Sequence, residues 1–117
     1  MENCIFCKII RGEIPSQKLY EDEDFLIFNN IKPNAKYHYL AILKEHFTTL
    51  VEMNQSQAEK LCKLLAKIPT LKDKLHLENG YRLIINQKGE QGNDASQEVM
   101  HLHIHILAGQ KMKWEPA

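Results

Sequence analysis

Polar and apolar residues alternate without interruption over residues 100–107, and every polar residue of this segment is a histidine. Such alternation predicts a half-buried strand, because successive side chains of a strand point to opposite faces of a sheet. The apolar residues are expected to enter a core. The opposite face then carries His101, His103 and His105.

Four other segments have the composition of strands. Their apolar and aromatic residues lie between Asp, Asn, Pro and Gly residues, which interrupt strands and form loops. The predicted strands are Lys18–Glu21, Phe25–Phe28, Tyr37–Leu43 and Tyr81–Asn86. Near the amino terminus, the spacing of Ile5, Phe6, Ile9 and Ile10 predicts instead a short amphipathic helix that ends at Gly12.

A longer helix is predicted in the middle of the chain. Ser56 is its expected N-cap, with Glu59 as the capping-box partner. Pro69 is expected to kink or interrupt this helix, with a continuation over residues 72–77 and a stop at residues 79–80. The apolar stripe that should pack on the sheet consists of Ala58, Leu61, Cys62, Leu65 and Ile68.

These elements predict an α+β fold in a single domain, residues 1–117. It contains a five-stranded, mostly antiparallel sheet with one long helix and a short N-terminal helix, and strands that follow one another in the chain are expected to be neighbours. The composition, 44% hydrophobic and 26% charged, is typical of a soluble globular protein.

Charge and cysteine content narrow the function classes. The net charge of +0 argues against nucleic acid or a membrane as partner through bulk electrostatics. The chain has no apolar run near 18 residues and no signal-peptide pattern, so a cytoplasmic location is expected. An odd number of cysteines, three, fits a reducing compartment better than a disulfide framework.

The alternating histidines suggest chemistry rather than a solvated surface. On a strand, neighbouring histidines lie roughly 7 Å apart and the outer two about 13 Å, so all three can hardly bind one metal. A central imidazole with one on each side could instead bracket a group the size of a phosphate. Cys4 and Cys7 form a separate CxxC motif, which is compatible with a redox pair, half of a zinc site or two buried thiols.

Residues 101–107, His-Leu-His-Ile-His-Ile-Leu, resemble the His-x-His-x-His-x-x signature of the histidine triad family. Further segments resemble the nucleotide-binding Hint branch of that family, so the resemblance covers nearly the whole chain. They are residues 5–10, 13–15, 20–22, 80–82 and 108–114. The resemblance implies a HIT-like fold and a homodimer.

The resemblance also implies a purine nucleoside phosphoramidase, a nucleotidyl hydrolase that cleaves the P–N bond between an amine and AMP or GMP. His103 is then the nucleophile that forms a covalent nucleotidyl-histidine intermediate, which water cleaves. Neutral imidazole is nucleophilic near pH 7, and covalent catalysis replaces one hard step by two easier ones. The other catalytic histidines that the resemblance implies are His38 and His105, beside the phosphate, and His101.

Nucleotide and metal positions follow from the same resemblance. The purine slot corresponds to Ile5, Phe6, Ile9, Phe28 and Ile31, each of which could equally be ordinary core. Further nucleotide-binding positions are Asn30, Asn86, Gln97, Glu98, Val99 and Trp114, the last reaching the partner protomer's site. In zinc-bearing members, the ligands of a structural zinc that the chemistry does not require correspond to Cys4, Cys7, His46 and His101.

Three features depart from the family pattern. Asn30 stands where an aspartate usually binds the ribose hydroxyls, so a charge-assisted hydrogen bond worth about 1 kcal/mol is lost. Glu98 stands where many members carry a serine near the leaving group; its carboxylate would repel the phosphate or, if protonated, act as an acid. The loop between Asn86 and Gln97 is longer than usual.

Three other functions are compatible with these residues. One is a nucleotide-binding regulatory protein with vestigial catalysis, of which Asn30 and Glu98 would be signs. Another is a metal-dependent hydrolase with His101 and His103 as ligands of a catalytic ion. The third is a dinucleoside polyphosphate hydrolase of the same family, which the short chain and the tail with Trp114 disfavour.

Overall fold

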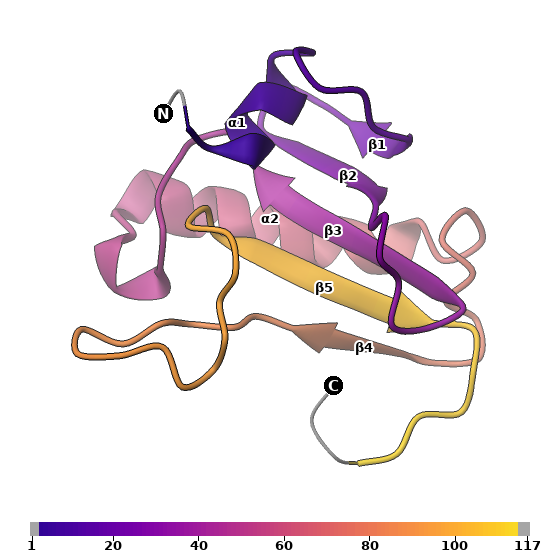
Figure 1. Ribbon diagram of the computed structural model, residues 1–117. Helices are drawn as coiled ribbons and strands as arrows, with labels where there is room; N and C mark the ends of the chain where they lie inside the picture. The colour runs from indigo at the N-terminus through magenta and orange to yellow at the C-terminus, as the bar shows by residue number, and fades with distance from the viewer. Residues whose placement is uncertain (1–2, 115–117) are drawn as a thin grey trace.

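The computed structural model describes residues 3–114, in which one sheet separates two helices of unequal length (Figure 1). The helices are α1 (Ile5–Ile10) and α2 (Gln55–Thr70), with a 3-10 turn η1 (Leu50–Glu52) before α2. The strands are β1 (Lys18–Glu21), β2 (Phe25–Asn29), β3 (Tyr37–Leu43), β4 (Tyr81–Ile84) and β5 (His103–Ala108). This arrangement confirms the predicted α+β fold class.

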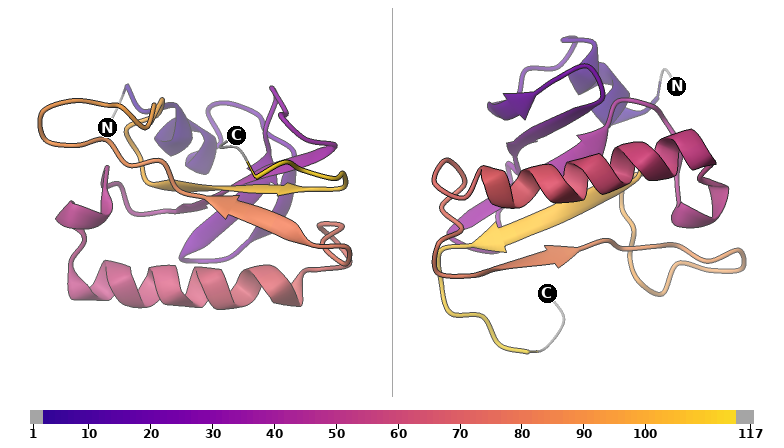
Figure 2. Two further views of the ribbon diagram at one scale, coloured as in Figure 1. Left: turned by 90° about the horizontal axis from the view of Figure 1, so that it is seen from below. Right: turned by 180° about the vertical axis from the view of Figure 1, so that it is seen from behind.

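Each face of the sheet packs against one helix, as Figure 2 shows from below. Alternate residues of the central strands point toward α2, where Ile27, Ala41 and Ile104 join Leu64 and Ile68 in the larger core. The intervening residues point to the other face and form a smaller core with α1, from Phe6, Ile9, Leu26, Leu40 and Ile42. The two-residue period of a strand therefore lets β2 and β3 contribute to both cores, whereas β5 contributes apolar residues only to the larger core.

The order of strands in the sheet is β1-β2-β3-β5-β4, and every neighbouring pair is antiparallel. The prediction that consecutive strands are neighbours is wrong at one place, because β5 pairs with β3 and displaces β4 to the edge. The reason is burial: β5 is buried at nearly every position, whereas Tyr81 and Leu83 of β4 are exposed. A strand that is buried along nearly its whole length, such as β5, is covered better between two other strands than at the edge of the sheet.

The ends of the predicted elements differ in detail from those observed. The strands β1 and β3 have the predicted limits, but β4 ends at Ile84 and β5 begins only at His103. Leu102 lies before β5, and its N–H donates to the carbonyl oxygen of Phe47 at 2.8 Å. His101 is therefore not a strand residue, although its side chain is fully buried.

Helix α2 begins earlier than predicted. Asn54 is the N-cap: its side chain accepts from the N–H of Gln57 at 2.9 Å, and Gln57 Oε1 accepts from the N–H of Asn54 at 3.0 Å. This reciprocal pair is a capping box two residues before the predicted one at Ser56 and Glu59. Both spacings satisfy the motif, and the side chain of Gln57 is also held by Glu45.

The predicted C-terminal limit of α2 and its predicted sheet-facing stripe are also wrong in part. The helix ends at Thr70 directly after Pro69, and residues 71–76 form turns rather than a continuation. Residues 79–80 therefore precede β4 instead of ending a helix, with Gly80 in the left-handed region (φ 105°). Cys62 and Leu65 are exposed, because the stripe facing the sheet consists of Gln57, Leu61, Leu64 and Ile68.

Among the described residues, no helix has the length and apolar character needed to cross a membrane.

Replacing Asn54 by Ala is expected to lower the free energy of unfolding by about 1 kcal/mol, because the N–H of Gln57 loses its acceptor. Urea denaturation followed by far-UV circular dichroism measures the change. Ser56→Ala is the matched control and should leave stability within about 0.3 kcal/mol of wild type. A larger loss for Ser56→Ala than for Asn54→Ala would contradict the observed cap.

Candidate active site and metal site

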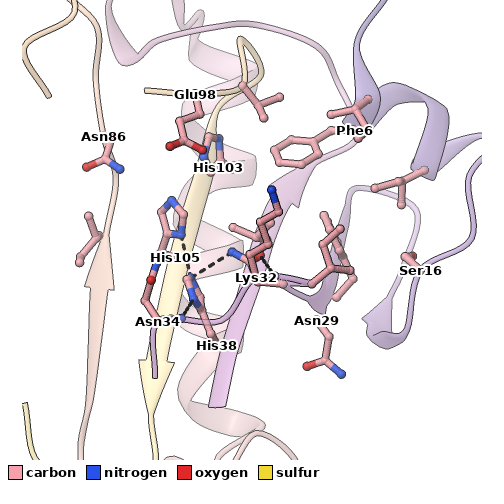
Figure 3. Close-up of a pocket in the computed structure, with 18 of the residues that line it drawn as sticks. Phe6, Ser16, Asn29, Lys32, Asn34, His38, Asn86, Glu98, His103 and His105 are labelled. Carbon is pink, nitrogen blue, oxygen red and sulfur yellow. Dashed lines mark hydrogen bonds between the residues drawn. The ribbon is translucent and has the colours of Figure 1, made fainter. Parts of the chain in front are cut away.

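A cavity of about 610 Å³ opens on the α1 side of the sheet, bounded by α1, the loop after β2 and the start of β5 (Figure 3). One wall is apolar. In it Phe6 contacts the ring of Phe28 edge to face, with centroids 5.6 Å apart, while Ile31 is 89% exposed at the mouth. The predicted nucleotide residues that line the cavity are Ile5, Phe6, Ile9, Phe28, Asn30, Ile31, Asn86, Glu98, Val99, His103 and His105.

His103 is the first residue of β5 and is buried beside the apolar wall, 5.1 Å from Phe6 between ring centroids. Its Nδ1 lies 2.8 Å from the carbonyl oxygen of His101. A carbonyl only accepts, so Nδ1 carries the hydrogen and Nε2 keeps its lone pair. Burial lowers the pKa of His103 from its ordinary value, which keeps this imidazole neutral and nucleophilic near pH 7.

Two further histidines form a chain of hydrogen bonds along the cavity, drawn as dashed lines in Figure 3. The N–H of Asn34 donates to Nδ1 of His38 at 3.0 Å, so the hydrogen of His38 is on Nε2. That atom donates to Nδ1 of His105 at 2.9 Å, which places the hydrogen of His105 on its own Nε2. The ring centroids of His103 and His105 are 5.0 Å apart, so this donor lies next to His103.

The pKa of His105 is lowered to about 4, first by burial and then by its neighbours His103 and His38, because three cations would repel one another. The pKa of His38 is lowered by burial alone. At neutral pH the three imidazoles are therefore uncharged. Their lone pairs and N–H groups are fixed by hydrogen bonds rather than by charge.

Asn30 contacts the same histidine chain. Its Oδ1 accepts from the N–H of Lys32 at 2.9 Å, and its Nδ2 lies 3.3 Å from Nε2 of His38. In the tautomer that Asn34 sets, Nδ2 of Asn30 and Nε2 of His38 both carry hydrogens, so neither accepts from the other. The hydrogen on Nε2 of His38 is therefore donated to His105. An aspartate oxygen at this position would compete with His105 for that hydrogen.

Three predicted residues do not line the cavity. Gln97 is buried; its Nε2 donates to the carbonyl oxygen of Thr48 at 2.9 Å, and its Oε1 accepts from the N–H of Lys88 at 3.0 Å. Its side chain therefore fixes the loop before the histidine strand. Trp114 is 94% exposed, and the imidazole of His101 points to the cysteines of α1.

The predicted metal ligands do come together. The nearest ligand atoms of Cys4, Cys7, His46 and His101 all lie within 4.8 Å of one another. The separations between Sγ and Nδ1 are 3.5 Å for Cys4 and His101, 3.3 Å for Cys7 and His46, and 3.6 Å for Cys7 and His101. A tetrahedral zinc with ordinary bond lengths places sulfur and nitrogen about 3.6 Å apart, so this group fits zinc.

The surroundings of His101 also fit a metal ligand. Its Nε2 lies 2.8 Å from the carbonyl oxygen of Leu43, which fixes the hydrogen on Nε2 and leaves the Nδ1 lone pair directed at the cysteines. The pKa of the Cys7 thiol is raised to about 11, first by burial and then by the neighbouring Cys4. A divalent cation would supply the charge that holds both thiolates. His101 thus has two contacts: its ring belongs to this group, and its carbonyl oxygen accepts the hydrogen bond from His103.

Several groups in the site were not predicted from the sequence. The N–H of Asn34 and the carbonyl oxygen of Leu43 set histidine tautomers, but main-chain atoms carry no signal in residue type. Lys32 and Ser16 also line the cavity, and Ser16 Oγ is buried with no hydrogen-bond partner in the described part of the chain. Lys32 follows the predicted Ile31 directly, which was the only available signal.

Comparison with known proteins adds a family and relatives. Residues 3–115 match the family described as "Scavenger mRNA decapping enzyme C-term binding". Over 107 residues the chain is 41% identical to Protein HitA of Neisseria gonorrhoeae, covering 92% of this chain and 96% of that protein. It is 40% identical over 114 residues to the 14 kDa zinc-binding protein of Zea mays, covering 96% and 86%. The crystal structure of a HIT family hydrolase from Legionella pneumophila Philadelphia 1 is similar with a TM-score of 0.87 at 40% identity, covering 98% of this chain and all of that one (100%).

The purified protein is expected to contain about one zinc ion per chain, measured by inductively coupled plasma mass spectrometry. Removing the ion with a chelator should lower the melting temperature by about 5 °C or more, because binding to the folded state alone stabilises it. Cys7→Ser should lose the ion, whereas Cys62→Ser, the matched control on the exposed cysteine, should retain it. Full zinc content in a Cys4→Ser, Cys7→Ser double variant would refute this ligand set.

Acidification is expected to destabilise the fold through His38 and His105. Their pKa values are lowered in the folded state, to about 4 for His105, while the unfolded chain has the ordinary value of about 6.5. Between these values the unfolded chain binds more protons, so the free energy of unfolding decreases as the pH falls from 7 toward 4.

Urea denaturation at pH 7.5 and pH 5.0 measures this dependence. His105→Asn, whose side-chain amide can occupy the position of Nδ1, should show a smaller loss of stability between the two pH values. His76→Asn is the control, because asparagine tolerates the left-handed backbone at that residue (φ 59°). An equal pH dependence in wild type and His105→Asn would contradict the assignment.

Proposed function

The chain belongs to the histidine triad (HIT) family, and from that membership we propose that it is a hydrolase of purine nucleoside phosphoramidates. Its substrates are AMP or GMP joined through phosphorus to the nitrogen of an amine. The single observation that carries the proposal is the 2.8 Å hydrogen bond from Nδ1 of His103 to the carbonyl oxygen of His101. It leaves a buried, neutral Nε2 as the nucleophile of the cavity.

The shape of the cavity supports a nucleotide as the ligand. The apolar wall of Phe6, Ile9 and Phe28 suits the flat face of a purine, and the volume of about 610 Å³ is in the range of small-molecule sites. Asn30 and Asn86 provide polar groups for the ribose and phosphate. The three histidines then surround the phosphate, where Nε2–H of His105 can donate to its oxygens.

The reaction proceeds in two steps in this proposal. The lone pair on Nε2 of His103 forms a bond to phosphorus, and the P–N bond breaks with its electron pair on the amine, which takes up a proton. The positive charge on the substituted imidazole is stabilised by the Nδ1–H bond to His101. A water oxygen then forms the P–O bond as the bond to Nε2 breaks, and the proton released from water balances the one the amine took.

The cysteine and histidine group has a structural role in this scheme. A zinc ion on Cys4, Cys7, His46 and His101 would hold α1 against the segment before β5. Because His101 also accepts the hydrogen bond from His103, the ion would keep that carbonyl in place. Cys62 carries a free thiol, and Cys4 and Cys7 are zinc ligands in this scheme rather than a disulfide, which supports a reducing, cytoplasmic location for the protein.

We also propose that the protein is a homodimer formed through β4. This strand is at the edge of the sheet, with Tyr81 and Leu83 exposed. An edge strand offers unpaired N–H and C=O groups to a second copy. Arg82 of β4 donates to the carbonyl oxygen of Lys113 at 2.6 Å, so Trp114 lies next to this edge, where it can reach the partner's site.

His103→Ala is expected to lower the rate of amine release from an adenosine phosphoramidate by at least about a thousandfold, because no other group in the cavity has the same free lone pair. Binding of AMP, measured by isothermal titration calorimetry, should change little. His76→Asn is the control, a histidine outside the cavity whose replacement should leave the rate unchanged.

The alternatives give different results in the same assay. Negligible turnover by wild type and His103→Ala alike, with AMP still bound, would favour a regulatory nucleotide-binding protein. Release of nucleotides from a dinucleoside polyphosphate, but not of amine from the phosphoramidate, would favour the other hydrolase. Immediate loss of all turnover on chelation, before any unfolding, would favour a catalytic metal ion.

A further inference from the structure

The cavity contains few charged side chains. Among the described residues that line it, Lys32 and Glu98 are, apart from the histidines, the only ones whose side chains are charged at neutral pH by residue type. Lys32 follows Asn30 and Ile31 at the end bounded by the β2–β3 loop. Glu98 lies next to His103, on the side of that ring away from Ser16 and Asn29 in Figure 3. The two charges are thus on different parts of the rim.

A second hollow, of about 730 Å³, begins at Glu98. It shares Ile5, Glu98 and Val99 with the first cavity and continues past Thr48 and Met100. Cys4 and His46 of the proposed zinc site also line it, and apart from them Glu98 is the only ionisable residue among the described residues of this hollow. No lysine or arginine of this hollow offsets the carboxylate.

The main chain holds Glu98 in this position. The preceding residue, Gln97, is buried, and both the nitrogen and the oxygen of its side-chain amide form hydrogen bonds. The carbonyl oxygen of the following residue, Val99, accepts from Gln97 Nε2 at 3.2 Å. The carbonyl oxygen of Met100 accepts from Thr48 Oγ1 at 3.3 Å. In the described part of the chain the exposed Glu98 carboxylate has no hydrogen bond or ion pair within the structure. It is therefore available to a ligand.

The direction of the leaving group follows from the proposed function. With the purine on the apolar wall and the phosphate at the histidines, the remaining open side of the phosphate is the side of Glu98 and the second hollow. A substituent on the amine nitrogen leaves the cavity along this side. Its first charged neighbour is a carboxylate.

We propose that Glu98 is a specificity-determining residue that selects phosphoramidates whose amine substituent carries a second, positively charged group. The inference rests on the proposed phosphoramidase function and names its substrate class. A phosphoramidate nitrogen is not basic, so the positive charge must be further along the substituent, as in a conjugate of a diamine. Glu98 repels the anionic phosphate of every conjugate. When the amine substituent carries an ammonium group near the carboxylate, their attraction offsets that repulsion, whereas an uncharged substituent does not.

Two conjugates of AMP test this selection. One contains 1,5-diaminopentane and the other 5-aminopentan-1-ol, so they differ only in a distant ammonium or hydroxyl group and have similar P–N bonds. Wild type should prefer the ammonium conjugate in kcat/KM by about three- to tenfold at low salt. The preference should decrease at about 0.5 M salt, because ions screen an accessible charge pair.

Variants assign the preference to one side chain. Glu98→Gln should bring the two kcat/KM values within about twofold of each other, and Glu98→Lys should reverse the preference. Glu90→Gln is the matched control, since Glu90 is exposed in the same loop and lines neither hollow. It should keep the wild-type ratio.

The outcomes separate the two proposals. Equal kcat/KM values for both conjugates in wild type, or an unchanged ratio in Glu98→Gln, would overturn the role of Glu98 and leave the phosphoramidase function intact. Turnover of both conjugates no faster than in His103→Ala would overturn the phosphoramidase function itself, and the selection by Glu98 with it.

Discussion

The site depends on the hydrogen bond from Nδ1 of His103 to the carbonyl oxygen of His101. This bond decides which nitrogen of the buried imidazole carries the hydrogen, and so which one presents a lone pair to the cavity. The acceptor belongs to a residue whose ring is held by the carbonyl oxygen of Leu43 and faces Cys4 and Cys7. His103 is therefore oriented by the same residue whose ring joins the group of Cys4, Cys7 and His46, with no flexible side chain between them.

The position of β5 in the sheet makes this arrangement rigid. β3 pairs with it on one side and β4 on the other, and both of its faces are covered, one by α2 and one by α1 and the cavity. Side chains that alternate along such a strand have no freedom to exchange faces, because a shift by one residue would move the histidines into the larger core and the apolar residues of β5 into the cavity. The packing of the larger core therefore also fixes the positions of His103 and His105 on the opposite face of β5.

Few charged side chains lie in the cavity beside β5. Burial keeps His38, His103 and His105 neutral. The chain of hydrogen bonds through His38 to His105 begins at the main-chain N–H of Asn34 rather than at a carboxylate. The full charges are at the rim, in Lys32 and Glu98. In the proposed function, this separation would place the nucleophilic chemistry in the buried part of the cavity and the discrimination between substrates in the accessible part.

Sequence alone determined the fold class, the limits of β1 and β3, and the residue types at the site, because a two-residue period and a His-x-His-x-His motif are local properties. The resemblance also gave the four-residue metal group, which the structure brings within 4.8 Å. Only the tertiary structure decided that β5 lies between β3 and β4, that Asn54 caps α2 and that Cys62 is exposed. These features depend on which of several equally suitable local patterns packs best. It also decided the histidine tautomers and the place of Gln97. These depend on main-chain N–H and C=O groups and on the contact between His38 and His105, which no residue type in the sequence identifies.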